Sequence, residues 1–513
     1  MSSPRTLDKA TAVAVVGAGS MGAGIAQLAA QCGHAVMLYD MQPGAGDRAL
    51  ARIAADLDGA VKRGRLDAAE RAAVLGRIRV PADLEALAGC GLAVEAIVEK
   101  LEAKKALFGE LERILGAEAV LATNTSSISI SAIAQGLAHP ARVIGWHFFN
   151  PVTRMKLVEV IPGVDTEPAL VAAMHALSRA WGKTSVDAPN APGFIVNRVA
   201  RPYYAEGLRL LGERIAAPES IDRLLRDAGG FAMGPFELID LIGADVNLSV
   251  TESVFAATAW DSRYAPSIIQ QELVRSGRHG RKTGRGFYAY RDGATPPVAP
   301  IVAVADDAAV KAVVASEMLL LAPLAERLRG AGVEVSINAG LSPETLQIGG
   351  ERFALTHGQT LAARRVHSGL PGPDAHAPTG LLDLARDYAT TTVLGATGSP
   401  AALAQLAAVL RPAGIDVIAL ADVAGLVVMR TIACIVNEAA DLMTWTTTTA
   451  ADIDTSMRLG MAYTRGPLAW ADAVGSARVV SVLAHLQAHY GDNRYRRAPR
   501  LSAAHYAKEP LHG

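Results

Sequence analysis

Cysteine is scarce in this chain, which has three in 513 residues. Cys32, Cys90 and Cys434 are widely spaced and match no metal-ligand pattern, so neither a disulfide framework nor a cysteine-based metal site is expected. His367 and His376 flank a short Gly/Pro stretch, which we interpret as an exposed loop rather than a metal site. This usage is typical of reduced thiols in a cytoplasmic protein that binds no metal.

The chain has almost no net charge either. Lys and Arg number 49 and Asp and Glu 50, which gives −1 at pH 7. No overall basic field therefore attracts nucleic acid or an anionic membrane, and an anionic ligand must be met by local charge. The longest apolar stretches, such as 425–435, are short and this one carries Arg430, so no membrane span is expected. Residues 1–10 lack the layout of a signal peptide.

A glycine-rich loop follows the first predicted strand. The hydrophobic pattern predicts a strand, a helix and a second strand over residues 11–16, 23–32 and 34–40. Between the first two stands Gly17-Ala-Gly19-Ser20-Met21-Gly22. In this setting Gly17 makes a tight turn, Gly19 lets the backbone approach a pyrophosphate, and Gly22 permits close helix packing. The start of the helix offers free N–H groups to phosphates, so these residues predict a Rossmann-type dinucleotide site.

Asp40 indicates which dinucleotide is bound. It closes the second predicted strand, downstream of Gly22, where an acid in such folds grips the ribose 2′-hydroxyl. The 2′-phosphate of NADP would meet this carboxylate, and a like-charge contact at about 4 Å costs about 4 kcal/mol at an effective dielectric of about 20. Since Met41-Gln42-Pro43 follows and offers no arginine, NAD is preferred.

His147 and Glu159 are the candidate proton-transfer pair. His147 lies among aromatic residues, and Glu159 follows shortly after it in the chain. A neutral imidazole accepts a proton on one nitrogen while a carboxylate on the other fixes its tautomer. On this segment alone, a histidine satisfied within the core is the more common case.

Two polar clusters have both a functional and a structural interpretation. Ser126 follows the predicted strand 119–123, at the end where ligands of α/β sheets bind, but it could equally cap the next helix. Lys62 and Arg63 stand at a polar break in the helical pattern of 48–78. They could hold a substrate phosphate or form a solvated helix end.

An ordered set of motifs between about residues 10 and 290 resembles the L-3-hydroxyacyl-CoA dehydrogenase family. The motifs are Gly17-Ala-Gly-Ser-Met-Gly22, Glu95-Ala-Ile-Val-Glu99, Asn124-Thr-Ser-Ser127, His147-Phe-Phe-Asn-Pro151, Leu157-Val-Glu159, Pro192-Gly-Phe-Ile-Val-Asn-Arg198 and Gly280-Arg-Lys-Thr-Gly-Arg-Gly-Phe-Tyr288. Members of this family use NAD to oxidise the 3-hydroxyl of an acyl-CoA thioester.

The resemblance implies a role for each matching residue. His147 would be the base and Glu159 its orienting partner, while Ser126 and Asn197 would contact the substrate hydroxyl and thioester. Residues expected along the cofactor are Gly17, Gly19, Ser20, Met21, Gly22, Asp40, Glu99, Lys104, Ser126, Asn150 and Lys282. Neutral donors such as Ser126 and Asn197 suit an alkoxide or carbonyl oxygen, because they do not trap it in an ion pair.

The second half repeats part of the first at a constant offset in residue number. The matching pairs are Pro168/Pro400, Gly182/Gly414, Gly193/Gly425, Arg198/Arg430, Ile221-Asp222/Ile453-Asp454, Gly234-Pro235/Gly466-Pro467, Asp240/Asp472 and Gly243/Gly475. Such a register predicts a duplicated helical domain. Asn197 corresponds to Met429, and residues 300–425 contain no second glycine loop. The second copy is therefore expected to be structural and to cover the first helical domain as a partner subunit would.

These patterns predict an α/β Rossmann-type domain followed by an all-α dehydrogenase domain that is duplicated. The expected segments are an NAD-binding domain, a helical substrate domain, a linker, a degenerate α/β segment and the second helical copy, over 1–190, 191–292, 293–310, 311–424 and 425–513. The chain could form a homodimer, or a monomer in which the second copy is an internal partner.

The leading interpretation of function is NAD-dependent oxidation of an (S)-3-hydroxyacyl-CoA. The tandem layout resembles bacterial enzymes of phenylacetate degradation that act on 3-hydroxyadipyl-CoA, and 3-hydroxybutyryl-CoA is nearly as well supported. A terminal carboxylate could meet Arg154, Arg201 or Arg263, although solvated arginines are the default. The alternatives are a dehydrogenase of a small free hydroxy acid or polyol, and a non-catalytic NAD-binding structural protein, as relatives in the lens are.

Overall fold

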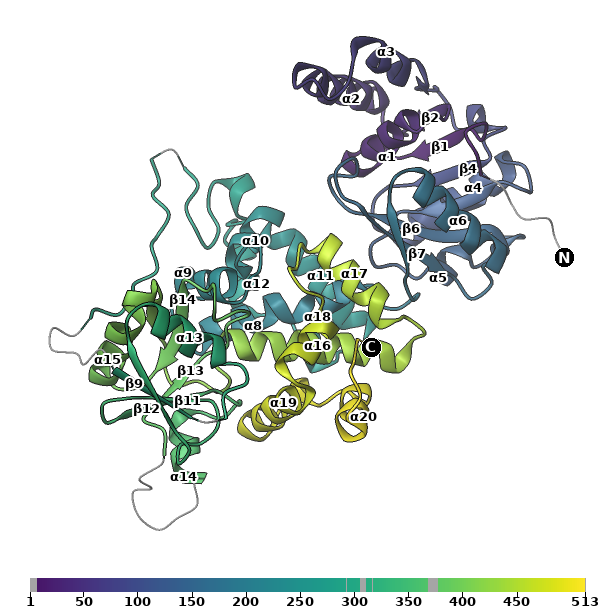
Figure 1. The fold of residues 1–513 in the computed structure, drawn as a ribbon. Coiled ribbons are helices and arrows are strands. Elements are labelled where there is room, and N and C mark those ends of the chain that lie inside the picture. The colour runs from purple at the N-terminus through teal and green to yellow at the C-terminus, as the bar shows by residue number, and fades with distance from the viewer. Residues whose placement is uncertain (1–6, 292, 305–310, 316, 368–376, 513) are drawn as a thin grey trace. The chain divides into compact units, whose positions relative to one another are not determined.

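The computed structural model describes residues 7–291, 293–304, 311–315, 317–367 and 377–512 (Figure 1). The Gly/Pro stretch expected as a loop near His376 lies outside these residues. The chain divides into two compact units. The first comprises Met1–Arg198 together with Thr446–Met461, and the second comprises Val199–Trp445 with Ala462–Gly513.

An eight-stranded sheet forms the centre of the first unit. The strand order is β3-β2-β1-β4-β5-β6-β7-β8. The strands are β1 Val13–Val16, β2 Val36–Tyr39, β3 Ile78–Arg79, β4 Leu92–Glu95, β5 Val120–Thr123, β6 Val143–Phe148, β7 Leu157–Pro162 and β8 Thr184–Asp187. All neighbours are parallel except β6 and β7, which are antiparallel. The carboxyl ends of β1, β4, β5 and β6 therefore share one edge of the sheet.

Helices cover this sheet (Figure 1). They are α1 Ser20–Gln31, α2 Ala45–Lys62, α3 Ala68–Gly76, α4 Leu101–Ile114, α5 Ile130–Ala134 and α6 Pro168–Ala180. Apolar side chains from α1, α2 and α6 form one core with alternate strand residues. The helical pattern of 48–78 forms two helices, which are separated at the polar break that Lys62 and Arg63 mark. Asp67 and Glu70 form a capping box that begins α3, and Ile78 already belongs to β3, so the expected end of the pattern is wrong.

One helix of the first unit comes from far along the chain. The helix α17, Ala450–Gly460, packs against β7 and β8. By the sequence repeat it belongs to the second helical copy, whose other helices lie in the second unit. Sequence spacing could not reveal this packing, because the segments in contact lie in different halves of the chain.

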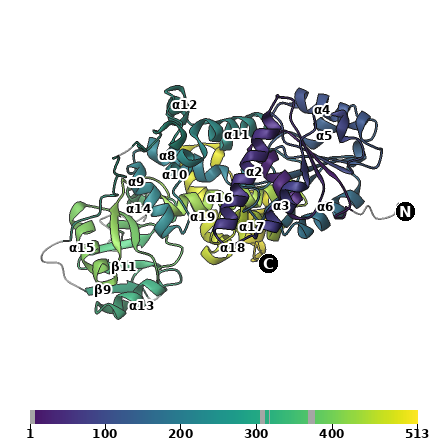
Figure 2. The same ribbon diagram turned by 90° about the horizontal axis from the view of Figure 1, so that it is seen from above.

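The second unit contains a sheet of its own, in the order β10-β9-β11-β12-β13-β14-β15. Its strands are β9 Lys311–Ala315, β10 Glu334–Asn338, β11 Thr345–Ile348, β12 Glu351–Leu355, β13 Gly380–Leu382, β14 Val393–Thr397 and β15 Asp416–Ala419. The helices α13 Ala322–Gly330 and α15 Pro400–Leu410 lie beside it (Figure 2), and α14 spans Leu361–His367. Parallel β14 and β15, joined by α15, form a strand-helix-strand unit within the segment expected to be degenerate α/β.

Both helical copies adopt the same local structure. The first consists of α7 Val196–Val199, α8 Arg201–Gly212, α9 Pro218–Arg223, a π-helical turn Leu224–Ala228, α10 Pro235–Ile242, α11 Ala244–Ala257 and α12 Ile268–Arg275. The second consists of α16 Val428–Trp445, α17, α18 Pro467–Val474, α19 Ser476–Tyr490 and α20 Pro499–Ala507. Phe194 and Leu426, which correspond in the repeat, both have positive φ, at 49° and 53°. The repeat therefore extends to unusual backbone positions.

Buried charges join the two copies where α16 packs along α8. Arg430 is fully buried and its guanidinium binds Glu206 at 2.7 Å and Glu213 at 2.9 Å. The hydroxyl oxygens of Tyr490 and Tyr495 also accept hydrogen bonds from Arg430, at 2.8 and 2.6 Å. Burial opposes ionisation of Glu206, yet Arg430 and Arg209 outweigh it and hold the pKa of Glu206 below its ordinary value. A buried charge compensated in this way ties the copies together.

Across the described part of the chain, no helix is long and apolar enough to cross a membrane. The same residues contain no cluster of three or more His, Cys, Asp or Glu side chains that could hold a metal ion.

Candidate active site

The glycine loop that joins β1 to α1 leaves no room for a side chain at Gly17 or Gly22. Gly17 has φ of +104°, and a Cβ there would lie 2.4 Å from the carbonyl oxygen of Ala96. A Cβ on Gly22 would lie 1.8 Å from the carbonyl oxygen of Gly17. By contrast, nothing lies within 4 Å of a Cβ built on Gly19. The loop is therefore tight against the protein at Gly17 and Gly22 and open at Gly19.

The start of α1 is suited to a phosphate. Gly19 is its N-cap and no side chain caps the helix. Gly19 and Ser20 are exposed and Met21 is half-buried. Uncapped N–H groups and the positive end of the helix dipole favour an anion at this point. The donors present thus fit the pyrophosphate of a dinucleotide.

Asp40 lies beside this loop at the end of β2. Its Oδ2 accepts a hydrogen bond from the backbone N–H of Ala18 at 2.7 Å, and its Oδ1 accepts one from Gln42 at 2.9 Å. The carboxylate is half-buried. It therefore carries fixed negative charge next to the glycine loop, as expected for a residue that accepts hydrogen bonds from a ribose.

Glu99 organises the segment that contains Ser126. Its Oε1 accepts hydrogen bonds from the Thr125 hydroxyl at 2.5 Å and from the backbone N–H of Ser126 at 3.0 Å. Its Oε2 lies 3.2 Å from the ammonium of Lys104. Burial disfavours the charged form, but Lys104 and the Thr125 and Ser126 donors outweigh it and hold the pKa of Glu99 below its usual range.

Lys104 lies behind Glu99 and is buried, with 1% of its side chain exposed. Its Nζ also binds Glu95 Oε1 at 2.6 Å, and Glu95 Oε2 accepts from Thr123 at 2.6 Å. The ammonium is thus compensated by two carboxylates. Lys104 was predicted to lie along the cofactor, but it is buried against Glu95 and Glu99. The role of Glu95 was not predicted from the sequence, because only the fold brings β4, α4 and β5 together.

His147 and Glu159 face each other directly across the antiparallel strands β6 and β7. His147 Nδ1 lies 2.7 Å from Glu159 Oε2. Both are buried, and the imidazole lies between Phe149 and Phe194, with ring centroids 4.6 and 5.9 Å away. Since a carboxylate only accepts, Nδ1 is the donor and Nε2 keeps its lone pair.

The second oxygen of Glu159 anchors the segment that carries Asn197. Glu159 Oε1 accepts hydrogen bonds from the backbone N–H groups of Ile195 and Val196, both at 3.0 Å. Asn197 follows at once on α7 and is half-buried. One carboxylate therefore fixes both the imidazole and the start of α7.

Asn124 holds the serine segment to the histidine strand. Its Oδ1 accepts the backbone N–H of Phe148 at 2.8 Å. Asn124 follows β5 directly and lies just before Ser126, and Phe148 follows His147 on β6. The structure therefore brings Ser126, His147, Glu159 and Asn197 to one edge of the sheet. Asn124 belongs to a motif visible in the sequence, but its role as a clamp was not predicted.

A cavity of about 590 Å³ opens beside the glycine loop. Its lining includes Gly19 and Ser20 from the start of α1, and Asn150 from the loop after β6. Arg52 and Arg154 also line it. The first three are predicted cofactor residues that the fold brings together. The two arginines add the local positive charge that a neutral chain needs for an anionic ligand.

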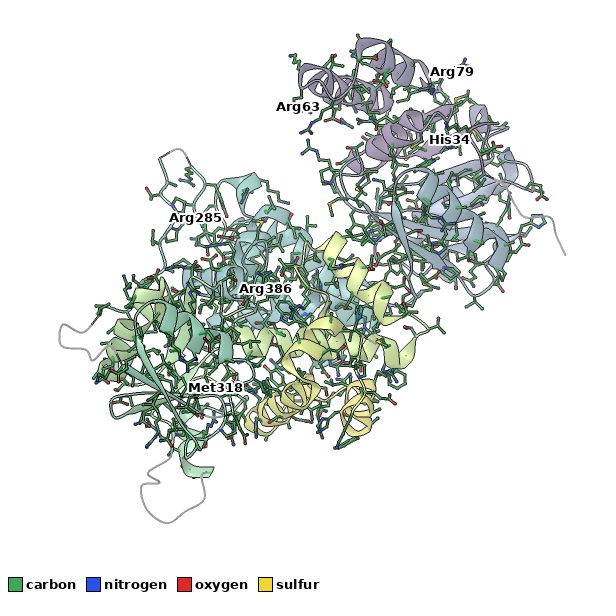
Figure 3. The ribbon with its side chains drawn as sticks, viewed as in Figure 1. His34, Arg63, Arg79, Arg285, Met318 and Arg386 are labelled. Carbon is green, nitrogen blue, oxygen red and sulfur yellow. The ribbon has the colours of Figure 1, made fainter. Side chains whose placement is uncertain are left out.

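Lys62 and Arg63 lie at the far end of α2, where both are exposed (Figure 3 labels Arg63). The helix has 18 residues, which corresponds to about 27 Å at about 1.5 Å per residue. They are thus well separated from the loop that follows Asp40. Lys282, in the second unit, pairs with Asp245 at 2.7 Å and is 45% exposed.

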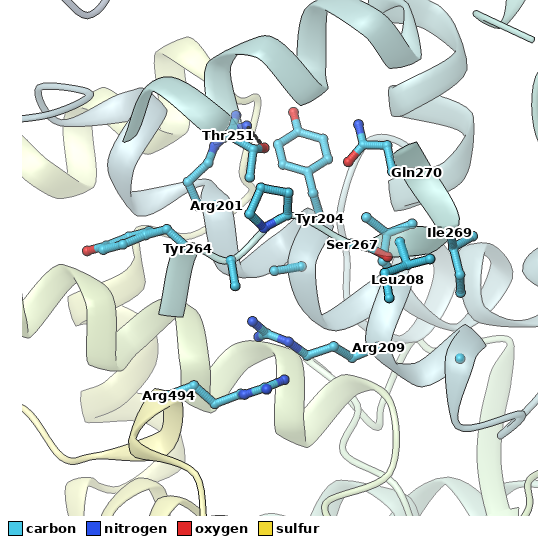
Figure 4. A pocket seen from close by; sticks show the side chains of 15 residues that line it. Arg201, Tyr204, Leu208, Arg209, Thr251, Tyr264, Ser267, Ile269, Gln270 and Arg494 are labelled. Carbon is cyan, nitrogen blue, oxygen red and sulfur yellow. Dashed lines mark hydrogen bonds between the residues drawn. The ribbon is translucent and has the colours of Figure 1, made fainter. Parts of the chain in front are cut away.

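A smaller cavity of about 290 Å³ lies within the second unit (Figure 4). Arg201, Tyr204, Thr251, Gln270 and Arg494 are among its lining residues. Burial lowers the pKa of Arg201, whose Nη1 donates to Thr251 at 3.1 Å. Arg263, another candidate partner for a substrate carboxylate, is held by Glu438 and Asp441 at 3.3 and 3.1 Å.

Comparison with known proteins decides the family. Residues 12–191 match the family described as 3-hydroxyacyl-CoA dehydrogenase, NAD binding domain. Residues 193–290 and 425–510 both match the 3-hydroxyacyl-CoA dehydrogenase C-terminal domain. The chain belongs to the 3-hydroxyacyl-CoA dehydrogenase family. It is an NAD-dependent oxidoreductase, and the predicted fold class, the cofactor and the duplicated helical domain are confirmed.

Similar proteins agree with this assignment. The chain is 42% identical over 484 residues to a 3-hydroxyadipyl-CoA dehydrogenase of Escherichia coli, a match that covers 94% of this chain and 95% of that protein. It is 40% identical over 280 residues to a probable 3-hydroxybutyryl-CoA dehydrogenase of Bacillus subtilis, covering 55% and 97%. A crystal structure of a 3-hydroxybutyryl-CoA dehydrogenase from Escherichia coli aligns with a TM-score of 0.86 and 40% identity, over 97% and 98% of the two chains.

Proposed function

We propose that the chain oxidises a short or dicarboxylic (S)-3-hydroxyacyl-CoA, with His147 as the general base and Glu159 as the residue that orients it. The single observation that carries the proposal is the 2.7 Å contact between His147 Nδ1 and Glu159 Oε2. It leaves Nε2 as the acceptor for the substrate hydroxyl proton. A base within hydrogen-bond reach of that oxygen is what oxidation of a secondary alcohol requires.

In this mechanism the protein handles the proton and the developing oxygen charge. NAD, when bound, would supply the hydride acceptor that the oxidation needs. His147 Nε2 takes the O–H proton, and Glu159 stabilises the imidazolium that results. Ser126 and Asn197 donate hydrogen bonds to the substrate oxygens, as neutral groups that release the ketone product.

The residues present fit NAD. The pyrophosphate would lie against the open side of Gly19, the uncapped start of α1, Ser20 and Met21. Gly17 and Gly22 shape the loop. Asp40 would accept the ribose hydroxyls. Three further residues complete this part of the proposal: Glu99 and Asn150 would lie along the rest of the cofactor, and Lys104 would keep Glu99 ionised.

The proposal also covers the CoA side of the site. Lys62 and Arg63, at the end of α2, would meet the substrate nucleotide phosphates. Lys282, which pairs with Asp245 within the second unit, stays a predicted cofactor residue. The acyl group would be that of 3-hydroxyadipyl-CoA or 3-hydroxybutyryl-CoA, and the 42% identity to a 3-hydroxyadipyl-CoA dehydrogenase supports the former.

The proposal extends to organisation and location. Residues 1–190 would bind NAD and 191–292 would contact the substrate, followed by the linker 293–310 and the degenerate segment 311–424. The copy at 425–513 would act as an internal partner, in a monomer or in each half of a homodimer. A cytoplasmic location is consistent with three free cysteines.

A substrate series tests this function. We expect kcat/KM to be high for 3-hydroxyacyl-CoA thioesters, and a comparison across chain lengths with and without a terminal carboxylate identifies the acyl group. Free CoA should compete with the substrate. Turnover of a free hydroxy acid or polyol that ignores CoA would overturn the proposal, as would NAD binding without any turnover.

A further inference from the structure

We infer that helix α17, from the catalytically silent second copy, positions the substrate-binding and orienting residues of the active site, with Gly460 as its point of contact. The inference rests on the proposed function, since it concerns the same His147, Glu159 and Asn197. It goes further by making Gly460 of the second copy a positioning residue for the site of the first.

The contact itself is tight. A Cβ built on Gly460 would lie 3.0 Å from Leu157 Cδ2 and 3.0 Å from Val196 Cγ2. Both side chains are buried, with at most 2% exposed. Leu157 lies on β7 on the same side of the strand as Glu159, and Val196 directly precedes Asn197. Gly460 therefore sits against both segments that Glu159 joins.

These two segments are the ones whose position affects the chemistry. The backbone N–H of Val196 donates to Glu159 Oε1 at 3.0 Å, and the other oxygen of Glu159 holds His147. A side chain at residue 460 would push Val196 and Leu157 away. It would thereby shift Asn197 and loosen the carboxylate that orients the base. Misplacement of reacting groups by about 1 Å can cost about 10²-fold in rate.

In the second unit the two copies exchange these roles. There a carboxylate binds the start of the second copy, and a helical segment of the first copy packs on the sheet. Asp383 Oδ2 accepts from the backbone N–H groups of Val427 and Val428 at 2.9 and 2.7 Å. These two residues correspond in the repeat to Ile195 and Val196. The π-helical turn of the first copy packs on β14 of that sheet. The backbone N–H of Arg386 also donates to the carbonyl of Ala228, in this turn, at 2.8 Å (Arg386 is labelled in Figure 3).

Each sheet thus receives its supporting helix from the other copy. In the second copy Met429 stands where the first copy has Asn197, so the second copy lacks the catalytic amide. Its structural role in the first unit accounts for its presence in the chain. The second copy supplies no catalytic amide of its own but completes the site in the first unit.

A graded series at Gly460 tests the inference in the full-length chain. We expect kcat to fall stepwise through Gly460→Ala, Gly460→Val and Gly460→Leu, reaching a loss of about 10- to 100-fold. The Kd for NAD and the Tm should stay near wild type. Ala451→Val, at an exposed position of the same helix, is the matched control and should keep wild-type kcat.

A second variant separates positioning from damage to the fold. Val196→Ala removes the methyl groups that Gly460→Val would strike, so the double variant should recover part of the lost kcat. Wild-type kcat in a folded Gly460→Leu protein would overturn the inference. So would a parallel loss of NAD binding and Tm without rescue. Failure of the proposed function is distinguishable, because the wild-type chain itself would then not turn over a 3-hydroxyacyl-CoA.

Discussion

Glu159 lies opposite His147 in the β6–β7 pair and binds its Nδ1 with one carboxylate oxygen, while the other oxygen accepts two backbone N–H groups at the start of α7. The carboxylate has no freedom to turn, because both of its oxygens are used. The imidazole is therefore held in one orientation and in the tautomer that exposes Nε2. The same carboxylate sets the position of Asn197.

We predict that Glu159→Gln lowers kcat by about 10²-fold or more, as loss of the orienting carboxylate does in other base catalysts. If the glutamine NH₂ group turns toward the N–H groups of Ile195 and Val196, donor meets donor. If it turns toward His147, it favours the tautomer in which Nδ1 accepts and Nε2 carries the proton, so Nε2 can no longer act as the base. Steady-state kinetics and NAD titration measure the effect, with NAD affinity expected to persist. The control is Glu110→Gln, at an exposed position on α4. Equal kinetics in the two variants would contradict the role.

The glycine loop gives a paired prediction for cofactor binding. Gly22→Ala should lower both Tm and NAD affinity, since its Cβ would lie 1.8 Å from a backbone oxygen. Gly19→Ala should leave Tm unchanged, because nothing lies within 4 Å of its Cβ, and still weaken NAD binding. Thermal unfolding and NAD titration check both. Unchanged NAD affinity in Gly19→Ala would show that the cofactor does not approach this face.

The lowered pKa of Glu99 predicts that the free energy of unfolding depends on pH. Its pKa in the folded protein lies below the ordinary 4.5, through Lys104 and the hydrogen bonds of Thr125 and Ser126 that outweigh burial. Its contribution is therefore present above that ordinary value and is lost as the pH falls through the lowered pKa. Glu99→Gln should reduce stability at neutral pH, and the difference from wild type should shrink on acidification. Urea unfolding across this range checks it, and a pH-independent difference would contradict it.

The ion pairs of Arg430 predict how much the contact between the two copies contributes to the free energy of unfolding. Arg430→Met leaves Glu206 buried beside one fewer cation, and breaking such a buried pair costs about 3–5 kcal/mol of unfolding free energy. The further change Glu206→Met should restore part of this loss, since it removes the uncompensated charge. Chemical denaturation measures both variants. An unchanged denaturation midpoint for Arg430→Met would show that the network contributes little.

Local signals in the sequence predicted much of the first unit. The predicted strand, glycine loop, helix and second strand correspond closely to β1, α1 and β2, and the predicted strand 119–123 corresponds to β5. Their hydrophobic periods are regular and their turn residues are distinctive. The polar break at Lys62 and Arg63 corresponds to the end of α2, whereas the capping-box spacing of Asp67 and Glu70, which begins α3, was not used in the prediction.

Long-range packing could not be predicted in the same way. Glu95, Lys104 and Asn124 acquire their roles only when separate strands meet. The contact of α17 with β7 and β8 joins segments whose sequences carry no mark of each other. The constant offset between the repeats predicted the duplication, but not which sheet each copy would support.

Substitution of His147 by glutamine tests the central claim most directly. Single-turnover oxidation of the preferred 3-hydroxyacyl-CoA by His147→Gln, measured beside NAD binding, isolates proton removal from cofactor affinity. The rate should fall by about 10²- to 10⁴-fold, the usual contribution of a positioned base, with the Kd for NAD close to wild type. A near-normal rate in the folded variant would contradict the assignment of His147 as the base.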